Sequence, residues 1–237
     1  YTLEAELNYA FTRGGSRAPA YNSIVAAGEN ACILHYDRND AEVKDGALIL
    51  IDAGCEYKYY ASDITRTFPA NGTFNPQQKA IYELVLKAQD AAIDAVQPGA
   101  PWDAPHNASV RVITQGLIKL GLIEGTLAKA IKAEAYRDFY MHRVGHWIGI
   151  DVHDVGDYKI DEKWRLLEPG MVTTIEPGIY IAPDNKRVPK KWRGIGVRIE
   201  DDVLVTKKGN RVLTTGIPKT VAEIETFMAQ AKQKRAA

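Results

Sequence analysis

Apolar residues recur at helical spacing in several stretches of the chain. The longest stretch runs from Pro76 to Val96, and one stripe of it is apolar: Ile81, Leu84, Val85, Ala88, Ala92 and Val96. The same spacing predicts shorter helices up to Gly14, over 107–120 and over 127–135. Thr220 and Glu223 have the spacing of a capping box, which predicts that a terminal helix begins there.

Other parts of the chain show short apolar runs and turn residues, which predict strands. Residues 47–57 and 59–68 are predicted to form two strands, and strands and tight turns follow from Tyr140 onward. No repeat or low-complexity linker divides the sequence. This mixture of helices and strands is typical of an α+β fold.

A hairpin between the first two strands would bring two acidic residues together. If Tyr57 and Lys58 form a two-residue turn, Asp52 lies opposite Asp63 with the Cβ atoms roughly 5 Å apart. Like charges in that position destabilise the strand pair, and a shared cation removes the conflict. The alternative is that Asp52 caps the turn at Gly54 and that Asp63 is an ordinary turn residue.

Composition narrows the class of protein. The chain has 237 residues, of which 46% are hydrophobic and 25% charged, which is ordinary for a globular protein. Because 30 basic residues balance 30 acidic ones, we expect no nucleic-acid partner and no broad anionic-membrane surface. No apolar run reaches the roughly 20 residues of a membrane span. Cys32 and Cys55 suggest no disulfide framework, and no signal peptide is visible, so we expect a cytoplasmic location.

Three histidines lie within 12 positions. His142 and His146 are four residues apart, as in zincins, but Arg143 replaces the glutamate that a zincin needs. Two glycines flank residues 146–148 and indicate a tight backbone rather than a helix. His153 follows in an apolar and acidic context, so the group favours a functional role over three unrelated structural histidines.

Two glutamates, Glu176 and Glu200, each follow an apolar residue in a predicted strand. An inward-pointing carboxylate is costly unless it is paired or bound to metal. For Glu200 the alternative is a salt bridge to Arg198 on the same strand face. With Asp52, Asp63 and His146, the two glutamates form an oxygen-rich ligand set that suits hard divalent ions such as Mn²⁺ and metal-assisted hydrolysis.

The chain resembles aminopeptidase P, the Xaa-Pro aminopeptidase family of pita-bread metallopeptidases, over essentially its whole length. The similar segments are HYDRND (35–40), DGALILIDAGCEYKYYASDITRTFPANGTF (45–74), HRVGHWIGIDVHDVG (142–156), LEPGMVTTIEPGIYIAP (167–183) and GIGVRIEDDVLVT (194–206). The resemblance implies a pita-bread fold, in which two pseudo-symmetric halves surround a curved antiparallel sheet with outer helices.

The same resemblance implies the roles of the site residues. Two divalent ions, most often Mn²⁺, would be held by Asp52, Asp63, His146, Glu176 and Glu200. Glu176 would also move a proton, while His153 and His35 would face the substrate carbonyl. The pocket for the proline ring would be lined by Tyr21, His142 and Arg198, with Tyr180 tied to that arginine.

The implied activity is hydrolysis that releases the N-terminal residue from peptides with proline in the second position. Prolidase, which cleaves Xaa-Pro dipeptides with almost the same cage, is an alternative, and a non-catalytic pita-bread binding module is another. Glu200-Asp201-Asp202 and segment 45–74 favour aminopeptidase P, and the complete ligand set argues against the binding module. The resemblance also implies that the full-length protein is a homo-oligomer.

The sequence departs from the family at two points. The N-terminal domain that precedes the catalytic domain in such proteins is not part of it, so we expect residues 1–237 to form a single catalytic domain. Arg143 stands where glycine is common, which would narrow the pocket or alter its charge. Trp102 and Trp164 lie beside proline or charged residues and are interpreted as packing residues.

Overall fold

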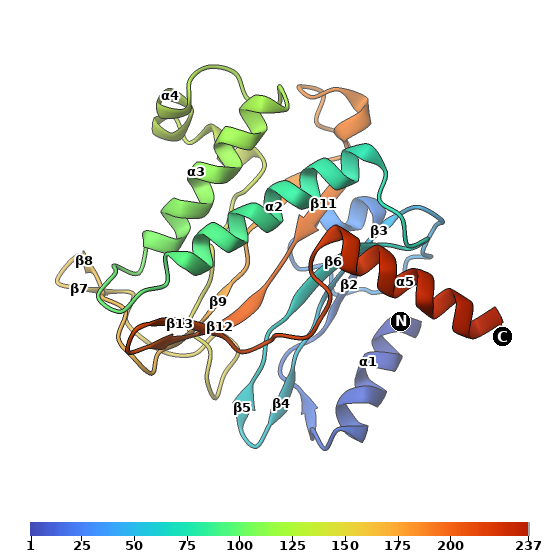
Figure 1. Ribbon diagram of the computed structural model, residues 1–237, viewed down its shortest axis with the longest axis horizontal. Helices are drawn as coiled ribbons and strands as arrows, with labels where there is room; N and C mark the ends of the chain where they lie inside the picture. The colour runs from blue at the N-terminus through green and yellow to red at the C-terminus, as the bar shows by residue number, and fades with distance from the viewer. Residues whose placement is uncertain (237) are drawn as a thin grey trace.

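Two long antiparallel hairpins, each broken near its middle, form the framework of the computed structural model, which describes residues 1–236 and side chains up to residue 234 (Figure 1). The first hairpin runs out through β3 (Leu48–Asp52) and β4 (Cys55–Tyr57) and returns through β5 (Tyr60–Ala61) and β6 (Thr65–Pro69). The second runs out through β9 (Val172–Ile175) and β10 (Gly178–Ile181) and returns through β11 (Ile195–Arg198) and β12 (Asp201–Thr206). The two hairpins therefore follow the same plan.

Short strands extend these hairpins. They are β1 (Ala18–Pro19) on β4, β2 (Ile24–Ala27) on β3, and β13 (Gly209–Val212) on β12, while β7 (Lys159–Ile160) and β8 (Lys163–Trp164) pair with each other. Every strand pair among the described residues is antiparallel. Antiparallel strands together with separate helices confirm the α+β prediction.

The helices agree with the sequence pattern except at their ends. They are α1 (Thr2–Arg13), α2 (Pro76–Asp94), α3 (Ala104–Lys119), α4 (Leu127–Lys132) and α5 (Val221–Ala236), with 3₁₀ turns η1 (Gly28–Cys32), η2 (Ala135–Asp138) and η3 (Lys190–Trp192). Thus α2 and α4 are shorter than predicted, and α3 begins three residues earlier. The capping box is present, since Glu223 Oε2 accepts from Thr220 N–H (2.8 Å) and Thr220 Oγ1 accepts from Glu223 N–H (3.2 Å).

The core lies where α2 crosses the strands with α3 packed along it (Figure 1). The predicted apolar stripe of α2 faces this core, and Ile81, Val85 and Ala88 are fully buried there. The two helices approach closely at Gly116, where a Cβ atom would lie 2.2 Å from the side chain of Leu84. Helix α2 also packs against β10 and β11, and Glu176 and Glu200 lie two residues beyond the adjacent ends of these strands.

The predicted register of the first hairpin was wrong by two residues. The turn consists of Lys58 and Tyr59, which have positive φ (51° and 68°), so Asp52 pairs with Thr65 and not with Asp63. Positive φ at both positions is the geometry of a type I′ turn, which glycine or asparagine normally marks in a sequence. A shift of two residues preserves the face of a strand. Both carboxylates therefore still lie on one side of the hairpin.

The cysteines and the helices bear on two further expectations from the sequence. Both cysteines are free thiols, in agreement with the expected lack of a disulfide. Among the residues that the structure describes, no helix has the length and apolar character needed to cross a membrane.

Candidate metal centre

The breaks in the two hairpins place acidic residues side by side. In the second hairpin the strand register is the same before and after the break, because Ile175 pairs with Asp201 and Gly178 with Arg198. Glu176 therefore lies opposite Glu200 across the break. Strand β6 of the first hairpin runs alongside, since Glu200 N–H donates to the carbonyl oxygen of Thr65 (3.0 Å). This contact joins the broken regions of both hairpins.

Gly54 allows Asp63 to approach the end of β3. A Cβ atom at Gly54 would lie 1.7 Å from the carbonyl oxygen of Ser62, so a side chain there would push the returning strand away. The backbone N–H of Asp63 donates to Asp202 Oδ2 (3.2 Å), which orients Asp63 from behind. The sequence analysis assigned no such role to Asp202.

His146 reaches the site from a loop that runs along the edge of β9. Thr174 N–H donates to the His146 carbonyl oxygen (3.0 Å), and His146 N–H donates to Thr174 Oγ1 (3.1 Å). This close approach requires Gly145, where a Cβ atom would lie 1.9 Å from the Thr174 carbonyl oxygen. The imidazole Nδ1 lies 2.9 Å from the carbonyl oxygen of Trp147. A proton on Nδ1 satisfies that carbonyl and leaves Nε2 as the free ligand atom.

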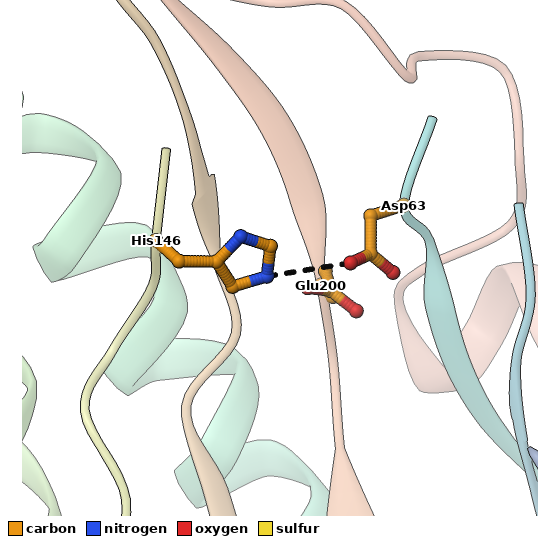
Figure 2. Close-up of side chains that lie close together, drawn as sticks. All are labelled: Asp63, His146 and Glu200. Carbon is orange, nitrogen blue, oxygen red and sulfur yellow. Dashed lines mark ion pairs between the residues drawn. The ribbon is translucent and has the colours of Figure 1, made fainter. Parts of the chain in front are cut away.

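Three of the predicted metal ligands converge closely. One atom each from Asp63, His146 and Glu200 lies within 4.8 Å of the other two (Figure 2). His146 Nε2 is 3.4 Å from Asp63 Oδ2 and 3.7 Å from Glu176 Oε1, so Glu176 borders the same group. Glu200 Oε2 also accepts from Thr65 Oγ1 (2.7 Å).

The fourth carboxylate, Asp52, lies beside this group and has partners of its own. Its Oδ2 accepts from Arg198 Nη2 (2.8 Å), and its Oδ1 lies within hydrogen-bonding distance of the Tyr21 hydroxyl. That hydroxyl also approaches Asp63 Oδ1. Because one O–H group donates one hydrogen, Tyr21 satisfies only one of the two carboxylates at a time. The alternative for Glu200, a salt bridge to Arg198, is not formed, since Arg198 pairs with Asp52 instead.

The carboxylates carry more negative charge than their surroundings balance. Asp63 is 5% exposed and Glu200 1% exposed. Burial, followed by repulsion from the neighbouring acids, raises the pKa of Glu200 well above its usual range, and burial raises the pKa of Glu176 to about 8. Burial also acts to lower the pKa of His146, but Asp63 and Glu176 outweigh it and raise that pKa to about 9. Carboxylate oxygens and one imidazole crowded in this way fit a divalent cation.

The cluster lines a cavity of about 700 Å³. The cavity lining includes nearly all of the predicted site residues: Tyr21, His35, Asp52, Asp63, His142, His146, His153, Glu176, Arg198 and Glu200. His35 and His153 are exposed, and the His153 ring centroid lies 4.2 Å from that of His146. Tyr180, the remaining predicted residue, lies behind the wall.

Tyr180 joins two pocket residues through its buried hydroxyl. The hydroxyl oxygen accepts from Arg198 Nη1 (2.9 Å) and lies 2.9 Å from His142 Nε2. Burial and the positive charge of Arg198 lower the pKa of His142 to about 3, so this imidazole is neutral. Its Nδ1 lies 2.7 Å from the Arg143 carbonyl oxygen, which leaves Nε2 to accept the Tyr180 proton. The chain of bonds fixes one side of the pocket.

The cavity also has an aromatic wall that the sequence analysis missed. Trp102, Tyr158 and Trp164 line it, although both tryptophans had been interpreted only as packing residues. The ring centroid of Trp102 is 4.8 Å from that of Tyr158. These side chains come from loops and the short β7–β8 hairpin, where no periodic pattern indicates which way a side chain points.

Comparisons with known proteins identify the relatives of this chain. The model of metallopeptidase family M24 matches residues 1–207. An Xaa-Pro aminopeptidase of Haemophilus influenzae is 54% identical over 228 residues, covering 96% of this chain and 53% of that protein. A human Xaa-Pro dipeptidase is 40% identical over 262 residues, covering 97% of this chain and 53% of that protein.

The solved structure of Pseudomonas aeruginosa aminopeptidase PepP has a TM-score of 0.97 and 68% identity, and the match covers 98% of this chain and 53% of that one. The chain thus spans about half the length of the relatives it matches. This likeness confirms the pita-bread fold that the sequence resemblance implied. From the extent of the family match and the identity to its relatives, we conclude that the chain belongs to metallopeptidase family M24.

Proposed function

We propose that residues 1–237 form the catalytic domain of a metal-dependent hydrolase that releases the N-terminal residue from peptides with proline in the second position. One observation supports this proposal: Asp52, Asp63, His146, Glu176 and Glu200, from separate segments, all line one cavity, and ligand atoms of Asp63, His146 and Glu200 lie within 4.8 Å of one another. The names of the Xaa-Pro aminopeptidase relatives support the choice of substrate.

The donor set supports two divalent ions, with Mn²⁺ as the proposed metal. Asp52 would hold one ion, Asp63 and Glu200 would be shared, and His146 with Glu176 would complete the second site. When bound, two such ions activate a water molecule and polarise the scissile carbonyl. Asp202 accepts a hydrogen bond from the backbone N–H of Asp63, and the Thr65 hydroxyl donates one to Glu200. These partners hold the two acids in place and bring no positive charge that would compete with a metal ion.

Glu176 is the proposed proton carrier. Its carboxyl group would accept a proton from the attacking water and return it to the leaving group. Its Oε2 lies 3.9 Å from His142 Nδ1, at the border between the acidic cluster and the proposed proline pocket. His153 and His35 lie on the exposed part of the lining and would orient the substrate carbonyl.

The proline ring would be recognised by shape. An Xaa-Pro bond has no N–H group, so the enzyme cannot identify it by a backbone hydrogen bond. The chain from His142 through Tyr180 to Arg198 provides a rigid wall for such a ring. Tyr21 would form the opposite wall, although its hydroxyl is directed at Asp52 and Asp63.

Hydrolysis of three peptides with added Mn²⁺ tests the function. We expect Ala-Pro-Ala to be cleaved, Ala-Pro to be a poor substrate and Ala-Ala-Ala to be resistant. Turnover of the dipeptide alone would support prolidase, the activity in the name of the human relative. If nothing is cleaved and Asp63→Asn does not alter Mn²⁺ binding, the chain is a non-catalytic module.

Two proposals concern the whole protein. We propose that the full-length protein is a homo-oligomer and acts in the cytoplasm, where free thiols such as Cys32 and Cys55 persist. Light scattering of the full-length protein and fractionation of cells test these two statements.

A further inference from the structure

Arg143 carries a positive charge that the protein itself does not neutralise. Within residues 1–236, its guanidinium group makes no ion pair. It lines the cavity, and its exposed side chain extends over Trp164, with the guanidinium carbon 5.2 Å from the ring centroid. The other arginine of the lining, Arg198, is bound to Asp52 and Tyr180. Arg143 is therefore the lining arginine that remains free for an anion.

The surroundings of Arg143 suit a carboxylate. Stacking on an aromatic ring holds the planar guanidinium group, and its paired N–H groups match the two oxygens of a carboxylate. Lys159 also stacks on Trp164, with its Nζ atom 4.7 Å from the ring centroid. Unlike Arg143, it does not line the cavity. Asp37 also lines the cavity and lies outside the metal cluster. As an acidic residue it would repel an anion rather than bind it.

The cavity lining therefore carries both signs of charge. Carboxylates form the metal cluster, while Arg143 stacks on Trp164 and directly follows His142, whose Nδ1 lies 3.9 Å from Glu176 Oε2. A short peptide also carries both signs of charge, and its carboxylate lies on the C-terminal side. In an extended Xaa-Pro-Yaa tripeptide, the terminal carboxylate lies two residues, or roughly 7 Å, beyond the scissile bond.

We propose that Arg143 is a specificity-determining residue that binds a substrate carboxylate on the C-terminal side of proline. This inference rests on the proposed function and adds a preference to it. The carboxylate is either the free terminus of a tripeptide or an acidic side chain in the third position. Both present the same planar anion to the guanidinium group, and suitable peptides distinguish them.

The test compares kcat/KM for Ala-Pro-Ala and its C-terminal amide, and for the amides Ala-Pro-Asp-NH₂ and Ala-Pro-Asn-NH₂. An exposed charge pair with good geometry predicts a roughly fivefold to tenfold preference for the anionic member of at least one pair, mainly through KM. Arg143→Gln should remove the preference and leave the amide rates within about twofold, and Arg143→Lys should keep part of it. Lys159→Gln, which removes the other cation on Trp164, is the matched control and should retain it. Raising the salt concentration should weaken it.

Equal rates for both members of each pair in the unmodified chain would overturn the inference. So would an Arg143→Gln variant that slows acids and amides equally, because Arg143 would then only support the wall. Tryptophan fluorescence titrations with Pro-Ala and Pro-Ala-NH₂ give the same comparison without turnover. An inactive chain that still binds the acid more tightly would refute the proposed hydrolysis and leave the role of Arg143 standing.

Discussion

The substitution Glu176→Gln should stabilise the metal-free protein and should reduce the further stabilisation that bound metal provides. In the metal-free protein, burial raises the pKa of Glu176 from its ordinary 4.5 to about 8. The folded state therefore holds a proton that the unfolded state releases, and stability falls as the pH rises from about 4.5 to 8. At pH 7.5 the difference of about three pKa units corresponds to at most about 4 kcal/mol. Glutamine removes this cost because it carries no charge.

The melting temperature measures the effect. For a chain of this size, 1 kcal/mol corresponds to about 2–4 °C, so metal-free Glu176→Gln should melt roughly 8–16 °C higher than the unmodified protein at pH 7.5. At pH 4.5 the two should melt together. Metal at 100 times its Kd adds about 2.7 kcal/mol to the free energy of unfolding of the unmodified protein. The Glu176→Gln variant should gain much less from the same metal concentration.

The exposed Glu168 provides the control, and Glu168→Gln should leave the melting temperature unchanged under every condition. The reasoning would be refuted if metal-free Glu176→Gln melted below the unmodified protein at pH 7.5. It would equally fail if the difference between the two proteins were the same at both pH values.

Three further substitutions probe the support of the site. Gly145→Ala, which places a Cβ atom 1.9 Å from a carbonyl oxygen of β9, should displace His146 and weaken Mn²⁺ binding at least tenfold in calorimetry, while circular dichroism shows a retained fold. Arg66→Met should lower the free energy of unfolding in urea by about 1–3 kcal/mol, because Asp201 loses the guanidinium group of a buried 2.7 Å ion pair but keeps Lys219 at 3.0 Å. Tyr180→Phe should raise KM for Ala-Pro-Ala several-fold and cost about 1 kcal/mol of stability, since two hydrogen bonds between pocket residues are lost. An unchanged value in any of these measurements would contradict the structural role assigned to that residue.

The sequence was informative where a periodic pattern or a motif coincided with a packing requirement. The stripe on α2 predicted the face that is buried, because helix periodicity and core burial have the same cause. Glu176 and Glu200 stand out as candidate metal ligands because they follow apolar residues in strands, where an unpaired charge is costly. Their convergence with His146 could be expected from family resemblance but not from periodicity, since it depends on loops.

Other features required the structure. The first hairpin turns at Lys58-Tyr59, and neither side chain marks a position of positive φ, so the register could not be derived locally. Arg198 pairs with Asp52, which is 146 residues away, although Glu200 is its neighbour along the strand. Sequence proximity favours the nearer acid, whereas the three-dimensional packing of the two hairpins decides the partner.

The same limit applies to the walls of the cavity. Trp102 and Trp164 resemble packing residues in the sequence, and they do pack, but the packed surface also faces the cavity. Only the arrangement of the loops reveals that second role.

Anomalous diffraction from crystals soaked with Mn²⁺ would locate the bound ions. We expect two peaks roughly 3.5–4 Å apart, both among the side chains of Asp52, Asp63, His146, Glu176 and Glu200. Absence of any peak among these five residues at saturating Mn²⁺, or peaks only elsewhere on the chain, would contradict this expectation.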